Sequence, residues 1–371
     1  MTTTPLAIAV PKETLPGELR VALVPDIVGR LTKAGHTVTV ERDAGAGARI
    51  LDSAYQAAGA RLADGPAAAL DGAAVVLKVR PPTAAEAAHV PANAALISYC
   101  QPQRDAEVLA LLHARGVRVL SMDYVPRSTI AQSMDALSSQ ASVAGYEAAL
   151  LGASLSVKFM PMLVTAAGTL APASVLVLGA GVAGLMAIAT ARRLGARVSA
   201  YDIRPEVKEE IESLGATFVA AEAVSADARA DQGYAKEVGE EMRKRQEAAL
   251  AKFVADADVL ITTAQVFGRK APTLVPRAMV ETMKPGAVIV DVAAETGGNC
   301  AVTQPGETIV HRGVTVAGPL DLPSRMPLHA SQMYARNVFN VLQHLTKSGT
   351  FTLNPEDEIV KGMLRVPGSA Q

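Results

Sequence analysis

Short runs of β-branched and other apolar residues alternate with segments of helical spacing along the whole chain. This alternation is typical of α/β folds built on parallel sheets. Helices are predicted after Asp26 and after Ser53, and Gly35 is expected to end the first of them. In the first part of the chain, five apolar runs predict strands at 6–10, 37–41, 74–79, 95–99 and 117–122.

The second part of the chain repeats this scheme, with predicted strands at 174–179, 197–201, 217–220, 258–264, 287–293 and 314–318. Two long helical segments, one after Asp135 and one at 331–345, are expected to join the halves. Because the last helix follows the second set of strands, the first domain should be discontinuous. We therefore expect two Rossmann-like, doubly wound parallel-sheet domains, 1–137 plus 327–371 and 138–326, with a ligand cleft between them.

One long segment, Phe159–Ala191, contains no charged residue and is long enough to suggest a membrane span. Pro161, Pro172 and four glycines interrupt it, and its second half has the pattern of a buried strand, a turn and a helix. A parallel strand covered on both faces is expected to be this apolar. We interpret the segment as core and the protein as soluble.

Composition narrows the classes of function. The 371 residues carry a net charge of −1, so no basic field indicates nucleic acid or an anionic membrane as a partner. Two cysteines, Cys100 and Cys300, fit a reducing compartment. The N-terminus has no signal-peptide pattern, and the six histidines have no metal-ligand spacing.

A glycine motif follows the strand predicted at 174–179. Gly179, Gly181 and Gly184 form G-x-G-x-x-G before a helix, and the next strand ends at Asp202, 18 residues after Gly184. Glycines in such a turn let backbone N–H groups approach a pyrophosphate at the helix N-terminus. Strand, turn, helix, strand and acid stand in the expected order, so the sequence predicts that 138–326 binds a dinucleotide.

Asp202 also bears on the choice of cofactor. A carboxylate accepts hydrogen bonds from ribose hydroxyls and repels the 2′-phosphate of NADP(H). Arg204 is the opposing signal, because a nearby arginine can bind that phosphate. We favour NAD(H). Two further strand ends, at Ala264–Gln265 and Asp291, are expected to line the same crevice, although loop polarity explains each of them equally well.

Two other stretches have alternative interpretations. "RSTIAQSMDALSSQ" (127–140) is either a polar helix start capped by Ser133 or Asp135, or a ligand-binding loop. Residues 222–252 form a long charged connection between predicted strands. They are either a solvated helix or a lid over bound NAD(H), with Tyr234 near its tip.

Several segments together carry a family resemblance that covers about residues 5–365. The chain resembles the alanine dehydrogenase and transhydrogenase superfamily. Within it, the chain is similar to the NAD(H)-binding component (domain I, the first section of the alpha subunit) of proton-translocating NAD(P) transhydrogenases. The segments are "VPKE…GELRVALVP", "LKVRPP", "PRSTIAQSMDALSSQASVAGYEAAL", "VLGAGVAGLMAIATARRLGA", "DVAAETGGNC" and "PSRMPLHASQMYARN".

The resemblance implies direct hydride transfer between NAD(H) on this chain and NADP(H) on a partner component, coupled to proton translocation. The enzyme is then a Re/Si-specific transhydrogenase, active only with its partner subunits. Because the chain ends at Gln371 without later apolar spans, the proton channel is expected in other subunits. The implied assembly is a homodimer, peripheral on the cytoplasmic face of the inner membrane.

The resemblance also implies residue roles. Arg127, Asp135 and Ser138 would orient the nicotinamide, and Gln132 would reach the second nucleotide. Ser128, Thr129 and Ile130 depart in detail from the family pattern, although their backbone contacts could survive. Besides these loop residues, the expected cofactor contacts are Gly179, Gly181, Val182, Gly184, Asp202, Ile203, Arg204, Gly233, Tyr234, Gln246 and Gln265.

Three functions remain as hypotheses. Hydride exchange between two nicotinamides needs no acid or base, whereas oxidation of an amine needs a proton acceptor. Alanine dehydrogenases carry a histidine where this chain has Gln101, and an aspartate where it has Glu295. Their keto-acid contacts match Lys78 and Arg20, which keeps an amino-acid oxidoreductase as the second hypothesis. The third is an NAD(H)-binding regulatory module without catalysis.

Overall fold

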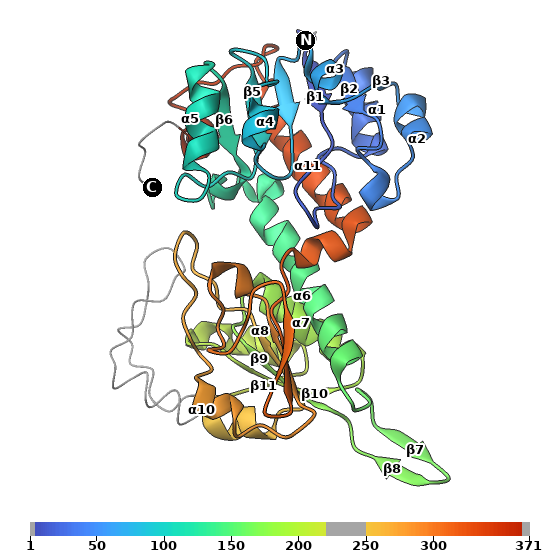
Figure 1. The fold of residues 1–371 in the computed structure, drawn as a ribbon, viewed down its shortest axis with the longest axis vertical. Helices are drawn as coiled ribbons and strands as arrows, with labels where there is room; N and C mark the ends of the chain where they lie inside the picture. Colours follow the sequence, from blue (N-terminus) through green and yellow to red (C-terminus); the bar gives the residue numbers. More distant parts are fainter. Residues whose placement is uncertain (1–3, 220–249, 366–371) are drawn as a thin grey trace. The chain divides into compact units, whose positions relative to one another are not determined.

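The computed structural model describes residues 4–219 and 250–365 and divides into two compact units. Unit 1 comprises 1–140 and 323–371, and unit 2 comprises 141–322. Each unit contains a seven-stranded, mostly parallel sheet with helices on both faces (Figure 1). The predicted fold class, two doubly wound α/β domains, is confirmed.

The sheet of unit 1 has the order β16-β6-β5-β4-β1-β2-β3, in which only β16 is antiparallel. Its strands are β1 Ala7–Val10, β2 Thr37–Glu41, β3 Arg61–Ala63, β4 Val75–Leu77, β5 Ala95–Ser98, β6 Arg118–Ser121 and β16 Leu364–Arg365. Its helices are α1 Pro25–Lys33, α2 Asp52–Ala57, α3 Pro66–Leu70, α4 Ala84–Ala87, α5 Ala106–Ala114, α11 Pro327–Leu345 and α12 Glu358–Met363.

Alternation along the strands of unit 1 explains its two core layers. Ile8 and Val10 of β1 pack with side chains of α1 and α11 on one face. Ala9, between them, packs with side chains of α3, α4 and α5 on the other face. Successive strand residues point to opposite faces, so a strand buried on both sides is apolar throughout.

The sheet of unit 2 has the order β11-β10-β9-β12-β13-β15-β14, with β14 antiparallel at the edge. Its strands are β9 Ser174–Leu178, β10 Arg197–Tyr201, β11 Thr217–Phe218, β12 Val259–Thr262, β13 Val288–Asp291, β14 Thr308–His311 and β15 Val314–Ala317. Helices α7 (Val182–Arg193) and α8 (Lys208–Ser213) cover one face, and α10 (Arg277–Val280) covers the other.

Helix α6 (Ala136–Leu155) contains the chain boundary between the units, and its later part packs on α7. The contact is made backbone to backbone, because a Cβ added at Gly145 would lie 2.0 Å from the carbonyl oxygen of Ala183. Any larger residue at 145 would push the two helices of unit 2 apart. Within the described residues, no helix is both long and apolar enough to cross a membrane.

Two predictions about local structure were wrong. Helix α1 begins at Pro25 and α2 at Asp52, each one residue earlier than expected, and Arg61–Ala63 form strand β3. The first half of the uncharged segment is not core. It forms an exposed antiparallel hairpin, β7 (Leu163–Thr165) with β8 (Gly168–Leu170). The second half is the buried strand β9 and helix α7, as predicted.

Candidate functional site

The glycine turn of unit 2 joins β9 to α7, and each end of the motif requires glycine. Gly179 has φ +97°, which strains an L residue. A Cβ at Gly184 would lie 1.9 Å from the carbonyl oxygen of Gly179. Thr263, which follows β12, donates its hydroxyl to that carbonyl at 3.0 Å and closes the turn from the other side.

The middle glycine of the motif faces open space. Gly181 is the N-cap residue of α7, and a Cβ there would meet no atom within 4 Å. Gly181 and Val182 are exposed, and the first N–H groups of a helix have no partner inside the helix. Open space, free donors and the positive end of the helix dipole fit the diphosphate of a dinucleotide.

Asp202, directly after β10, ties the turn to the neighbouring strand end. Its Oδ2 accepts the backbone N–H of Ala180 at 2.7 Å. Arg204 donates from Nε and Nη2 to the two carboxylate oxygens, each at 3.0 Å, and its backbone N–H reaches Oδ1 at 2.9 Å. The hydrogen bond to Asp202 raises the pKa of Arg204. The arginine is therefore already engaged by a carboxylate.

The next strand ends separate into one exposed and one internal group. Asn299 holds Ala264 through two hydrogen bonds of 3.0 and 2.8 Å, and Gln265 is exposed beside it. Asp291, in contrast, is fully buried and accepts hydrogen bonds from two threonine hydroxyls and two backbone N–H groups. The expectation that Asp291 lines a crevice is wrong, because its oxygens organise the loop that follows β13.

In unit 1, the polar loop between β6 and α6 is held firmly at its far end. Asp135 caps α6: its Oδ1 accepts the backbone N–H of Ser138 at 2.9 Å, and its Oδ2 accepts the Ser138 hydroxyl at 2.6 Å. The carbonyl of Ser133 accepts side-chain N–H groups of Asn337 and Asn340, both at 2.9 Å. The predicted cap at Asp135 is confirmed, and α11 supplies anchors that we did not predict.

The remainder of the loop divides into buried anchors and exposed side chains. Ala131 and Met134 are buried in the core of unit 1. Exposed side chains lie on either side of Ala131, namely Arg127, Thr129, Ile130 and Gln132. The hydroxyl oxygen of Ser128 is buried and has no hydrogen-bond partner. A buried polar atom of this kind is rare in native proteins, and an amide or hydroxyl of a bound nucleotide would satisfy it.

The position expected for a catalytic histidine holds a fixed amide. Gln101 donates from Nε2 to Oδ1 of Asp123 at 2.8 Å, and the backbone N–H of Cys100 binds Oδ2 at 2.7 Å. Burial raises the pKa of Asp123, and these hydrogen bonds oppose the shift. A neutral amide pinned in this way takes up no proton, which agrees with the absence of an acid–base pair in the sequence.

Three predicted cofactor residues, Gly233, Tyr234 and Gln246, lie outside the described residues, as does most of the predicted lid. Sequence reasoning also missed Thr263, Asn299, Asn337 and Asn340. Only the asparagines of α11 had a visible signal, since two polar residues three positions apart interrupt the apolar spacing of that helix. In the described part of the chain, no group of three or more acidic, histidine or cysteine residues could hold a metal.

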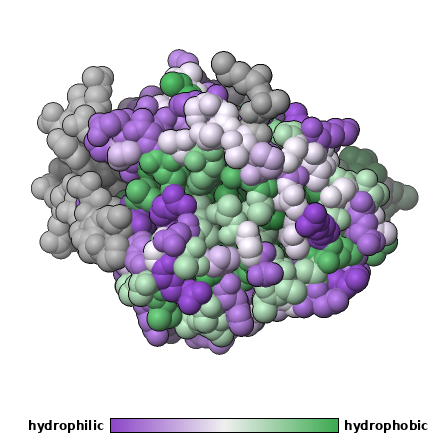
Figure 2. Space-filling model, turned by 90° about the horizontal axis from the view of Figure 1, so that it is seen from above, coloured by the Kyte–Doolittle hydropathy of each residue, from purple (hydrophilic) through white to green (hydrophobic). Residues whose placement is uncertain are grey.

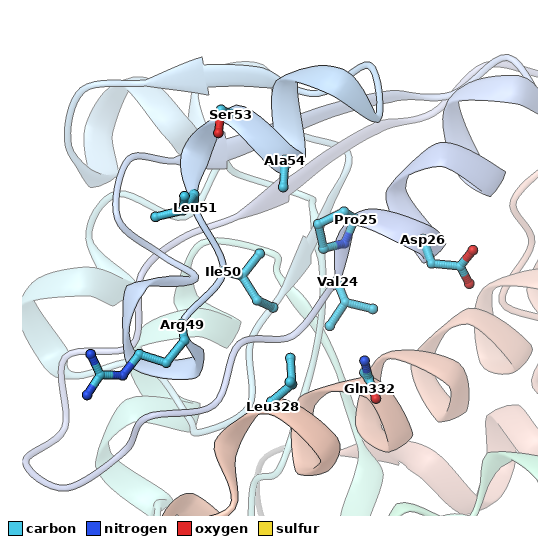
Figure 3. Close-up of a pocket in the computed structure, with 10 residues that line it drawn as sticks. All are labelled: Val24, Pro25, Asp26, Arg49, Ile50, Leu51, Ser53, Ala54, Leu328 and Gln332. Carbon is cyan, nitrogen blue, oxygen red and sulfur yellow. The ribbon is translucent and has the colours of Figure 1, made fainter.

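Unit 1 also has two adjoining surface hollows that share Arg49 and Leu328. Figure 3 shows the one between η1, α2 and the start of α11, with the apolar side chains of Ile50 and Leu51 at its wall. No residue of the predicted nucleotide site lines either hollow. On the face seen in Figure 2, an apolar area is bordered by hydrophilic side chains.

The sheet topology, the glycine turn and the acid after β10 define an α/β dinucleotide-binding protein. Residues 9–144 match the family "Alanine dehydrogenase/PNT, N-terminal domain", and residues 148–370 match "Alanine dehydrogenase/PNT, C-terminal domain". The chain belongs to the alanine dehydrogenase/transhydrogenase family.

Individual relatives separate the two branches of this family. An NAD(P) transhydrogenase alpha subunit of Rhodospirillum rubrum is 45% identical over 365 residues, covering 96% of this chain and 95% of the relative. A crystal structure of transhydrogenase from Sinorhizobium meliloti has a TM-score of 0.88 at 42% identity, covering 96% and 97%. Alanine dehydrogenase of Bacillus subtilis is 31% identical over 298 residues, covering 79% and 72%. The chain is closer to the transhydrogenase branch.

Proposed function

We propose that this chain is the NAD(H)-binding subunit of a proton-translocating transhydrogenase. It transfers hydride directly between NAD(H) and an NADP(H) molecule held by a partner component. The observation that carries this proposal is a complete dinucleotide turn in unit 2, combined with a polar loop in unit 1 that has no proton acceptor. The likeness to named transhydrogenase alpha subunits supports it.

The nicotinamide ring of NAD(H) supplies the carbon that gives or accepts the hydride. In unit 2, the open N-terminus of α7 at Gly181 binds the diphosphate, and Asp202 accepts the ribose hydroxyls. Val182, Ile203 and Gln265 complete this side, as do the predicted contacts beyond the described residues. All of these groups bind and position the nucleotide, and none moves a proton.

In unit 1, Arg127, Asp135 and Ser138 orient the nicotinamide end. The Ser128 hydroxyl gains its missing partner there, and the backbone at Thr129 and Ile130 borders the ring. Gln132 is exposed between two buried anchors, Ala131 and Met134, so it can reach towards the second nucleotide while the loop stays fixed. Preorganised positioning of this kind brings the two reacting carbons within roughly 3–3.5 Å.

The proposed function is tested with the purified chain and an NADP(H)-binding transhydrogenase component. Hydride transfer from NADH to an oxidised NADP analogue should require both proteins. Transfer no faster than with either protein alone would rule the proposal out, and would leave a regulatory NAD(H)-binding module. Alanine-dependent reduction of NAD by the chain alone would instead establish the second candidate, an amino-acid dehydrogenase, for which Lys78 and Arg20 are the supporting residues.

The membrane partners are part of the same proposal. Proton-conducting helices belong to other subunits, and this chain binds them from the cytoplasmic side as a peripheral subunit. Inside-out membrane vesicles stripped of this chain should regain NADH-dependent NADP reduction when it is added back. Right-side-out vesicles should not. Equal recovery in both preparations would contradict the proposed side.

Asp202 is expected to set the preference for NADH. Asp202→Ala removes a charged acceptor from the ribose, so the Kd for NADH should rise by about 10- to 100-fold. Glu206→Ala, which removes an exposed carboxylate four residues later, should leave the Kd unchanged. Fluorescence titration with NADH and NADPH measures both variants. Tighter binding of NADPH than of NADH by the unaltered chain would overturn this role.

We also propose that the chain forms a homodimer through its hairpin. β7 and β8 expose apolar side chains at Val164 and Leu170, which are 73% and 51% accessible (Figure 1). Paired apolar residues on an exposed hairpin are typical of a buried interface. Light scattering should give twice the 38.4 kDa chain mass. Val164→Lys should yield monomers, whereas Thr169→Lys, at the paired position, should disturb the dimer less. A monomeric unaltered chain would contradict this.

A further inference from the structure

Unit 1 has its own topological switch point. From β1 the chain adds β2 and β3 on one side of the sheet, and β4, β5 and β6 on the other. In open α/β sheets, ligands bind outside the carboxyl ends of the strands where this order reverses. In unit 2 that position, between β9 and β12, holds the glycine turn. In unit 1 it lies between the ends of β1 and β4.

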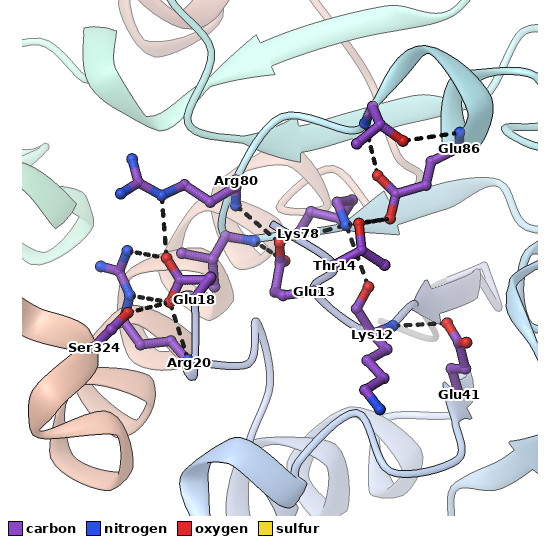
Figure 4. A network of polar contacts seen from close by, with 12 residues as sticks. Lys12, Glu13, Thr14, Glu18, Arg20, Glu41, Lys78, Arg80, Glu86 and Ser324 are labelled. Atoms are coloured by element: carbon purple, nitrogen blue, oxygen red, sulfur yellow. Dashed lines mark hydrogen bonds and ion pairs between the residues drawn. The ribbon is translucent and has the colours of Figure 1, made fainter. Parts of the chain in front are cut away.

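The switch point of unit 1 is filled by a carboxylate of the chain itself. Glu13, three residues after β1, accepts the backbone N–H of Val79 at 2.6 Å and that of Arg80 at 3.3 Å (Figure 4). The ammonium of Lys78, which directly follows β4, lies 3.4 Å from the same carboxylate. Two successive N–H groups with an adjacent cation are the elements of an anion-binding site.

Lys78 depends on its carboxylate partners because it is only 2% exposed. Its second partner is Glu86, at 3.3 Å. Burial raises the pKa of Glu13, whereas Lys78 and the two N–H groups lower it. The ionised carboxylate is therefore held in place by these three groups and not by solvent.

The surrounding network is balanced in charge. Glu18 forms a two-pronged ion pair with Arg20 at 2.7 and 2.6 Å, and it also accepts Nε of Arg80 at 3.1 Å. Together with Lys78, Glu13 and Glu86, the network contains three cations and three carboxylates (Figure 4). Removing one carboxylate leaves an excess buried positive charge, which is costly unless another anion replaces it.

We infer that unit 1 contains a second anion site at its switch point, which the chain occupies with the carboxylate of Glu13. The ligand class that fits the vacated site is a small monocarboxylate, because two N–H groups and one ammonium match a single carboxylate head. The consequence for the intact chain is that this crevice is closed to anionic ligands, so the dinucleotide is left to unit 2. The inference is independent of the catalytic proposal.

The test is chemical rescue of Glu13→Ala by formate. Thermal unfolding is followed in sodium formate and in sodium chloride of equal ionic strength. The variant should unfold at a lower temperature than the unaltered chain, and formate should raise its Tm saturably by roughly 3 °C over chloride. The unaltered chain should show no difference between the two salts.

Two further variants sharpen this test. Glu41→Ala removes a carboxylate that binds the backbone N–H of Lys12 at the edge of the same region, and it should show no formate effect. Glu13→Gln keeps the site filled, so it should also not respond. A Glu13→Ala chain that does not fold in chloride should refold in formate, as judged by circular dichroism. Absence of a formate-specific gain in Glu13→Ala, or an equal gain in every variant, overturns the inference.

Discussion

Gln132→Asn is expected to slow hydride transfer about 100-fold while changing the Kd for NADH by less than about threefold. The substitution keeps the amide but shortens its reach by one methylene. Gln132 is exposed and its neighbour Ala131 is buried, so the loop itself should not move. Transfer is measured in the mixed assay with the NADP(H)-binding component, and affinity by NADH fluorescence.

Ser133→Ala is the matched control for this experiment. Ser133 is the adjacent exposed residue, and its contacts with α11 use the backbone carbonyl, which alanine retains. Its transfer rate should stay near that of the unaltered chain. Parallel losses of rate and affinity in Gln132→Asn would show that the amide binds this chain's own nucleotide and does not reach the second one.

Gly184→Ala should abolish NADH binding and also lower stability. The added methyl would lie 1.9 Å from the carbonyl oxygen of Gly179, so the turn and α7 must separate. Overpacking of this kind costs about 1–3 kcal/mol, and the turn that binds the diphosphate is displaced as well. Calorimetry should show a lower Tm, and titration should show an NADH Kd raised by at least about 100-fold.

Gly29→Ala in α1 provides the control for adding a methyl group. There the new Cβ would lie 3.9 Å from its nearest neighbours in Ala58, an ordinary contact. Alanine in a helix should stabilise the chain by about 0.5–1 kcal/mol without affecting nucleotide binding. A Gly184→Ala chain with the NADH affinity of the unaltered protein would disprove the role of the turn.

The parallel strands could be predicted closely because burial on both faces leaves an uninterrupted apolar run. β2 and β10 have the predicted limits, and the other parallel strands predicted by such runs lie within one to three residues of theirs. The short edge strands β3, β14 and β16 were missed. They are half exposed or only two to four residues long, so hydrophobic pattern says little about them.

The hairpin β7–β8 was assigned to the core for the opposite reason. Apolar composition reports that a surface avoids water, and it does not distinguish a core from an interface with another chain. The first half of the uncharged segment therefore looked like its second half, although only β9 and α7 are buried.

The candidate site divides in a similar way. The glycine turn could be predicted because glycine spacing is local and each glycine has a backbone reason. The hydrogen bonds of Asp291 were not predictable, because the same acid at a strand end can face a ligand or organise a loop. The anchoring of Ser133 by Asn337 and Asn340 joins residues about 200 positions apart, a separation that no local pattern encodes.

That anchoring also has a consequence for the order of synthesis. Tyr334, Val338 and Val341 of α11 complete the core of unit 1, yet they leave the ribosome after all of unit 2. Unit 2 is continuous in sequence and can fold while translation proceeds. Unit 1 cannot. A nascent chain stalled before residue 327 should therefore acquire a folded dinucleotide domain while the nicotinamide loop still lacks the helix that fixes it.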